Sequence, residues 1–221
     1  MAKRKAEKEM KPWERSRHRS SGQRRVGTRP TYRSFLIVCE GTETEPNYFE
    51  QFRAVVRFAK ISVRGLGKDP ATIVHKAKGH CAKEEARRGS AFDEVWCVFD
   101  VDDFGEVVNA AVRAAKDAGF QVACSNPCIE LWFLLHFHDQ REAITRDQLF
   151  ARLSSCLKRE YSKTDPDLFA LLYDHRAAAV QRAEKLVASY SERSGGLNLA
   201  VHNPVTKVHE LVEALFVNLD E

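Results

Sequence analysis

The sequence lacks a long hydrophobic run. Of its 221 residues 43% are hydrophobic, yet no uninterrupted apolar stretch approaches the roughly 20 residues that a membrane-spanning helix needs. The first residues are basic and no hydrophobic segment follows them, which argues against a secretory signal. We therefore expect a cytoplasmic protein that does not enter a membrane.

The sequence also lacks two common motifs. None of its six cysteines forms a CxxC pair, and Cys39 and Cys97 fall within apolar runs, so free buried thiols are favoured over a zinc site or disulfides. No Gly-x-x-x-x-Gly-Lys-Ser/Thr phosphate loop occurs either. Any coupling to ATP hydrolysis must therefore come from a separate protein.

Positive charge is concentrated at one end of the chain. Residues 1–33 carry twelve Lys or Arg against three Glu, whereas the remainder carries more acidic than basic residues. This segment has almost no apolar periodicity, so we expect a disordered arm that contacts nucleic-acid phosphates without reading sequence. A solubilising tail is the alternative. The candidate contact residues are Arg15, Arg17, Arg19, Arg24 and Arg25.

Strand-like and helical segments alternate through the middle of the chain. Strands are predicted at 35–39, 61–64, 95–100 and 121–125, separated by helices at 44–59, 69–88 and 104–118. Thr44 is expected to cap the first of these helices. This order predicts an α/β fold with a mostly parallel sheet. From residue 129 onward the pattern is helical, with helices expected near 129–137, 145–159, after 166, at 176–190 and at 204–217.

Two acidic clusters stand at the ends of predicted strands. Glu40 and Gly41 follow the first strand, and Asp100 and Asp102 end the third in an Asp-x-Asp pattern. Ligands of open α/β sheets bind outside the carboxyl ends of the strands, and oxygen ligands of this kind suit Mg²⁺. The Asp-x-Asp pattern alone also occurs in solvated loops that bind no metal. Several carboxylates clustered together, however, favour a bound cation.

Glu130 is a further candidate ligand. It follows Asn126-Pro127 and the fourth strand, so we expect it in the first turn of a helix facing the same crevice. Alternatively, Glu130 is not a ligand, and its carboxylate only interacts favourably with the dipole at the helix N-terminus. His136 and His138 end this apolar segment and are interpreted as structural, with one of them bonding to carbonyl groups at the helix end.

Three segments together resemble the RloB family, a bacterial group associated with phage-defence and restriction loci. They are residues 35–49, 99–104 and 125–137, and the similarity extends over most of the chain after Arg33. The resemblance implies a Toprim-like fold, a small α/β sheet that carries a Glu on its first strand and an Asp-x-Asp on a later one.

The resemblance also implies roles for particular residues. Glu40, Asp100 and Asp102 would form a divalent-metal site. Toprim nucleases of the overcoming-lysogenisation-defect class use a second early acid, a later Glu and a downstream Lys, for which Glu45, Glu130 and Lys163 are the matching positions. The spacing from Glu40 to Glu45 is one residue longer than that class usually shows. The predicted domains are a basic arm (1–33), a Toprim-like core (34–145) and a helical extension packed on it (146–221).

The resulting hypothesis is a nuclease that cleaves DNA or RNA phosphodiesters with Mg²⁺ or Mn²⁺, acting as the effector of an anti-phage (abortive infection) system. Glu40, Asp100, Asp102 and Glu130 would hold the metal, with Glu45 as a further ligand, and Lys163 would offset charge on the phosphorane. Glu40 is alternatively the base. The competing hypothesis is a non-catalytic subunit that binds nucleic acid or an ATPase encoded beside it. The sequence leaves the oligomeric state open.

Overall fold

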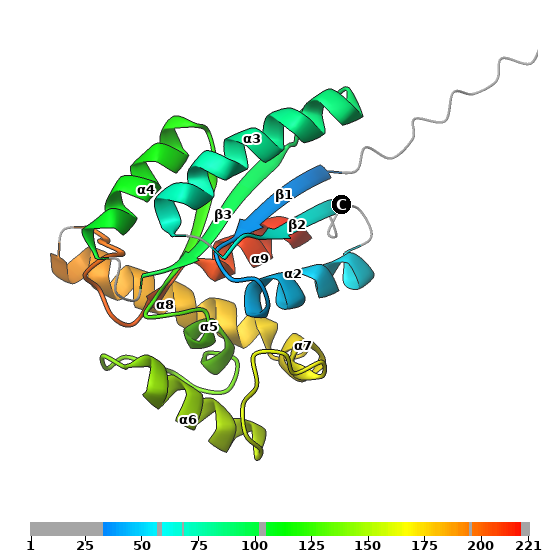
Figure 1. The fold of residues 1–221 in the computed structure, drawn as a ribbon. Helices are drawn as coiled ribbons and strands as arrows, with labels where there is room; N and C mark the ends of the chain where they lie inside the picture. Colours follow the sequence, from blue (N-terminus) through cyan, green and yellow to red (C-terminus); the bar gives the residue numbers. More distant parts are fainter. Residues whose placement is uncertain (1–32, 57–58, 68, 102–104, 195, 218–221) are drawn as a thin grey trace, which may run out of the picture. The chain divides into compact units, whose positions relative to one another are not determined.

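A five-stranded sheet forms the centre of the protein. The computed structural model describes residues 33–56, 59–67, 69–101, 105–194 and 196–217. The strands of this part of the chain are β1 (Arg33–Cys39), β2 (Ala59–Gly65), β3 (Glu94–Asp100), β4 (Gln121–Asn126) and β5 (Val205–Thr206). Their order is β2-β1-β3-β4-β5, and all neighbours pair in parallel except β5, which is antiparallel to β4 (Figure 1).

Helices cover both faces of this sheet. The helices of the described part of the chain are α2 (Thr44–Val55), α3 (Pro70–Arg88), α4 (Glu106–Asp117), α5 (Glu130–Leu134), α6 (Arg146–Leu157), α7 (Leu168–Tyr173), α8 (Arg176–Ser194) and α9 (Val208–Phe216). Helices α3 and α4 pack on one face, and α2, α5 and α9 pack on the other (Figure 1). The predicted α/β class is confirmed, and the architecture is consistent with a Toprim-like fold.

The strand β1 contributes side chains to two hydrophobic cores. Phe35 and Ile37 pack into the core beneath α2, α5 and α9, whereas Leu36 and Val38 pack into the core beneath α3 and α4. Successive side chains of a strand point to opposite faces, so a continuous apolar run fills both cores. This explains why the strand reads as an unbroken hydrophobic segment, as strands of parallel sheets do.

The strand order reverses direction at β1. From this strand the chain crosses to β2 on one side, and β3 and β4 then add on the other side. The ends of β1 and β3 therefore border the point where ligands bind in open parallel sheets. Glu40 follows β1 and Asp100 ends β3, so these two carboxylates lie at this point.

Several helix ends follow from local sequence. Asp69 accepts a hydrogen bond from the Thr72 backbone N–H at 3.0 Å and caps α3, and Thr145 forms a capping box that begins α6. The predicted cap of α2 was wrong. Thr44 is already helical, Glu43 stands before it without a side-chain cap, and the helix ends at Val55.

The C-terminal segment differs from the prediction. A helix was expected to begin at Pro204, but β5 comes first and α9 begins only at Val208. The Asn203 side chain accepts from the Ile144 backbone N–H at 2.9 Å and donates to the Ile144 carbonyl at 3.1 Å. Asn203 therefore joins the loop before α6 to the segment that leads into β5.

The basic arm and the predicted domain boundaries are not tested by this structure. Residues 1–32, which include the arginines expected to contact nucleic acid, lie outside the described residues. The division at residue 145 stays a prediction. Among the described residues, no helix is both long and apolar enough to cross a membrane.

His136 is buried at the end of the α5 segment, as the structural interpretation required. Only 2% of it is exposed, and its Nδ1 hydrogen-bonds the Trp132 carbonyl at 2.9 Å, which joins it to the core. Burial lowers the pKa of His136 from 6.5 to about 4, because a charged ring loses its hydration there. The ring is therefore neutral in the folded protein at neutral pH.

The free energy of unfolding should fall as the pH drops from about 6.5 toward about 4. In this window the unfolded chain binds a proton at His136 that the folded protein excludes, which costs at most about 1.4 kcal/mol per pH unit. Urea unfolding at several pH values measures this slope. A His136→Gln variant should show a shallower slope; an unchanged slope would contradict the prediction.

Candidate metal and phosphate site

A polar cavity of about 410 Å³ lies beside the ends of β1 and β3. It combines acidic side chains with two cationic ones, and its walls come from six separate parts of the chain. The lining residues are Glu40, Gly41, Thr42, Glu43, Thr44, Glu45, Gly67, Asp69, Asp100, Ile129, Glu130, Arg146 and Lys163. Most of the residues singled out in the sequence therefore meet in one place.

Glu40 and Asp100 are joined directly. The Asp100 backbone N–H donates to Glu40 Oε2 at 3.2 Å, and the Glu40 backbone N–H donates to the Val98 carbonyl at 2.8 Å. The second bond continues the backbone pairing of β1 with β3 by one residue beyond β1, and the first joins the Glu40 carboxylate to the backbone of Asp100. The ladder thus fixes the Glu40 carboxylate next to the Asp100 position.

Gly41 lets Glu45 fold back over the end of β1. The Gly41 backbone N–H donates to Glu45 Oε1 at 3.1 Å, and a Cβ at Gly41 would lie 2.0 Å from Glu45 Oε2. Glu45 is 5% exposed. Burial raises its pKa, and nearby Glu130 adds to this, although hydrogen bonds from its own backbone and that of Gly41, together with Lys163, act in the opposite direction.

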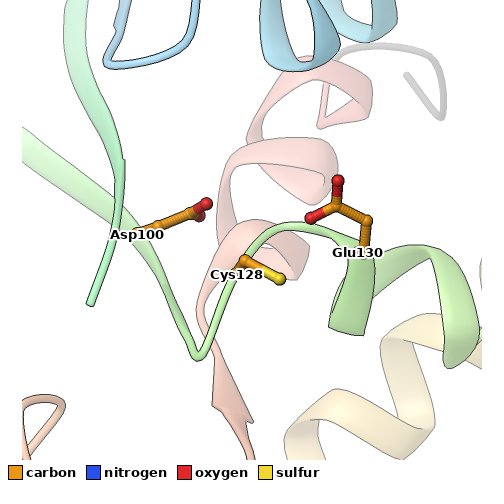
Figure 2. Close-up of side chains that lie close together, drawn as sticks. All are labelled: Asp100, Cys128 and Glu130. Carbon is orange, nitrogen blue, oxygen red and sulfur yellow. The ribbon is translucent and has the colours of Figure 1, made fainter. Parts of the chain in front are cut away.

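Asp100, Cys128 and Glu130 form a cluster of candidate metal ligands. One ligand atom from each side chain lies within 4.8 Å of the others. Figure 2 shows Asp100 at the end of β3, directed toward Cys128 in the loop between β4 and α5 and toward Glu130 at the start of α5. The Tyr161 hydroxyl donates to Glu130 Oε1 at 3.0 Å, which orients the Glu130 carboxylate within the core.

Two cations face these acids. Lys163 is exposed, its Nζ lies 5.7 Å from the centre of the Phe150 ring, and its charge lowers the pKa of Glu45. Arg146, the first residue of α6, places Nη2 3.5 Å from Asp100 Oδ2. Both belong to the helical part of the chain, which therefore completes a site begun by the sheet.

The structure brings together five of the predicted site residues, and their catalytic and metal-binding roles stay predictions. The five are Glu40, Glu45, Asp100, Glu130 and Lys163. Asp102 was predicted as a ligand and lies outside the described residues. Sequence reasoning missed Cys128 and Arg146. Cys128 was interpreted as a buried free thiol, which it is, and its place two residues before Glu130 was the available signal.

The residues of the cluster fit a divalent cation of the Mg²⁺ or Mn²⁺ class. Carboxylate oxygens are the ligands that these ions prefer, and Glu130 is 2% exposed. Acidic groups brought together in a desolvated pocket repel one another, and a cation offsets that repulsion. Burial raises the pKa of the Cys128 thiol, and this class of ion prefers hard oxygen donors to sulfur, so the carboxylate oxygens are the principal donors.

A Gly65→Ala variant should disturb the site through the backbone. The added Cβ would lie 2.5 Å from the Gly41 carbonyl oxygen and 2.7 Å from Pro46 Cγ, so the segment that carries Glu45 must shift. We expect a loss of about 1–3 kcal/mol in the free energy of unfolding and weaker metal binding, measured by urea unfolding and calorimetry.

Gly79→Ala is the matched control for this substitution. Gly79 is exposed within α3, and a Cβ added there would have no atom within 4 Å. The substitution should stabilise the protein by about 0.4–1 kcal/mol and leave metal binding unchanged. If Gly65→Ala and Gly79→Ala had the same free energy of unfolding and the same metal affinity, the close packing of Gly65 against the segment around Gly41 would be contradicted.

Comparison with known proteins assigns the chain to a family. The RloB-like protein family matches residues 35–215, a span that includes every described residue of the cavity. No curated protein and no solved structure matches the chain. The match covers well over half of the sequence, so the chain belongs to the RloB family.

Proposed function

We propose that this protein is a metal-dependent nuclease that cleaves nucleic-acid phosphodiesters. The observation that carries the proposal is the meeting of Glu40, Asp100 and Glu130 with Lys163 and Arg146 in one cavity. Carboxylates that can hold a cation, placed opposite side chains that can bind phosphate, are the parts that phosphoryl transfer requires. The cavity lies at the carboxyl edge of a parallel sheet, where such folds bind ligands.

Each side chain has a role that follows from its position. Asp100, Glu130 and Glu40 would hold the cation, and Tyr161 would keep Glu130 oriented through its 3.0 Å hydrogen bond. Lys163 would offset negative charge as it develops on the phosphoryl oxygens. A bound Mg²⁺ or Mn²⁺ supplies Lewis acidity and lowers the pKa of water.

Glu45 is suited to a different task from the other acids. Burial raises its pKa, and a carboxyl group with a pKa nearer the working pH can hold and release a proton. We therefore assign proton transfer to Glu45 Oε2, which faces Gly41. Glu40 is the second candidate for this role, because its side chain also lines the cavity.

The test is cleavage of labelled DNA and RNA by purified protein in Mg²⁺, Mn²⁺ or EDTA, beside an Asp100→Asn variant. We expect cleavage that requires the metal and that Asp100→Asn abolishes. Asp117→Asn is the matched control, because Asp117 is exposed at the end of α4. Cleavage by Asp100→Asn at the wild-type rate would refute the proposal.

A non-catalytic binding subunit is the competing outcome of the same experiment. The protein would then bind nucleic acid and metal, yet cleave neither DNA nor RNA under any condition. Electrophoretic mobility shifts recorded on the same samples separate this outcome from a protein that binds no nucleic acid at all.

We further propose that the protein acts as a phage-defence effector together with a separate ATPase. The support is membership of the RloB family and a sequence that contains no phosphate-binding loop of its own. Co-purification with the product of an adjacent ATPase gene, with cleavage stimulated in the complex, is the expected result. Cleavage that is unaffected by that protein would argue against the partnership.

A further inference from the structure

Arg146 contacts a carboxylate that a bound cation would use as a ligand. Its Nη2 lies 3.5 Å from Asp100 Oδ2, and Asp100 belongs to the cluster with Cys128 and Glu130. The Arg146 guanidinium thus partly offsets the negative charge of Asp100, which is one of the candidate metal ligands. The capping box at Thr145 fixes the start of α6 and with it the backbone of Arg146.

The contact between Arg146 and Asp100 is suited to exchange. The distance of 3.5 Å is at the outer limit of a hydrogen bond, and 40% of the Arg146 side chain is exposed, against 13% of Asp100. Water screens the exposed guanidinium, so a pair at this distance stabilises the protein little. A divalent cation brings twice the charge and can contact more than one carboxylate of the cluster, so it outcompetes the single guanidinium.

A displaced Arg146 stays at the cavity. Its side chain lines the same cavity as Lys163 and Glu40, and its backbone is held by α6. The guanidinium presents a planar set of donors that matches two phosphate oxygens at once, whereas the ammonium of Lys163 acts as a point charge. A phosphate that enters the cavity would therefore meet both kinds of donor.

We propose that Arg146 exchanges Asp100 for a phosphodiester group of the nucleic acid when a divalent cation occupies the cluster. Binding of the cation and binding of the phosphate are then coupled, because the first releases the side chain that the second requires. This inference rests on the proposed function. It adds a residue that neither the family resemblance nor the sequence pattern assigned, and it explains why an arginine lies among candidate ligands.

The exchange predicts opposite effects of one substitution. In an Arg146→Ala variant, Mn²⁺ affinity measured by calorimetry without nucleic acid should rise about two- to fivefold, because the competing charge is gone. The affinity for a single-stranded oligonucleotide in Ca²⁺, measured by fluorescence anisotropy, should fall about tenfold. Arg146→Lys should recover part of the oligonucleotide affinity, since it keeps the charge but not the planar fork.

Arg141→Ala is the matched control. It removes the same charge five residues earlier in the chain, from a side chain that is 78% exposed, and should change neither affinity by as much as twofold. The exchange is refuted if Arg146→Ala leaves Mn²⁺ affinity unchanged or lowers it, if it binds the oligonucleotide as tightly as the wild type, or if the wild type binds no Mn²⁺. Neither the Mn²⁺ affinity nor the oligonucleotide affinity requires cleavage. If both affinities shift as predicted but the protein cleaves no nucleic acid, the nuclease proposal is overturned and the exchange of Arg146 still holds.

Discussion

A Glu130→Gln variant should lose metal-dependent cleavage almost completely. Glu130 is 2% exposed and lies within 4.8 Å of the other two cluster residues, measured between ligand atoms. Loss of a group that merely orients a ligand costs about 10–100-fold in metal affinity or activity, so loss of the ligand itself should cost about 100-fold or more. Initial rates of oligonucleotide cleavage and calorimetric Mn²⁺ binding measure the two effects.

Two further variants make this result specific. Tyr161→Phe removes only the hydroxyl that donates to Glu130 Oε1, and should give a smaller loss of about 10–100-fold. Glu160→Gln changes an exposed neighbouring carboxylate and should have no effect. If Glu130→Gln retained the wild-type Mn²⁺ affinity, Glu130 would not be a ligand.

A Trp132→Ala variant should lose about 3–5 kcal/mol in its free energy of unfolding. Trp132 is fully buried, and its Nε1–H donates to the Tyr48 hydroxyl at 2.9 Å. The substitution therefore leaves a large cavity and also removes the partner of a buried hydroxyl group. Urea unfolding followed by circular dichroism gives the difference.

Val201→Ala serves as the comparison for Trp132→Ala. Val201 is 64% exposed, so its truncation should change the free energy of unfolding by no more than about 0.5 kcal/mol. A Trp132→Ala protein as stable as Val201→Ala would mean that α5 contributes little to the core. That outcome would conflict with the aromatic contacts of Tyr48 to Phe49, Phe52 and Phe133.

The sheet was predictable because its signals are local. Apolar runs bounded by turn residues located β1 and β3, and the acidic residues at their carboxyl ends identified the edge that carries the cavity. The short strand β5 was missed, because Val205 and Thr206 form no run and pair with β4 only through contacts distant in sequence. The start of α2 was misplaced, because Thr44 is a preferred capping residue, whereas the helix already includes Thr44 and follows Glu43, which makes no side-chain cap.

The candidate site was only partly predictable for the same reason. Glu40, Asp100 and Glu130 each stand at a strand end or a helix start, where position along the chain indicates position in the fold. Arg146 carries no such signal. It reaches Asp100 across 46 residues, through the packing of α6 against α5, and no spacing rule connects the two positions.

The pairing of Asn203 with Ile144 has a consequence for protein synthesis. Ile144 precedes Arg146 by two residues, and both of its backbone groups are held by a side chain made 59 residues later. While the ribosome is still translating the intervening segment, this anchor does not exist. The loop before Arg146 can thus gain this anchor only late in translation, and an unfinished chain would carry the acidic strand ends before the anchor forms.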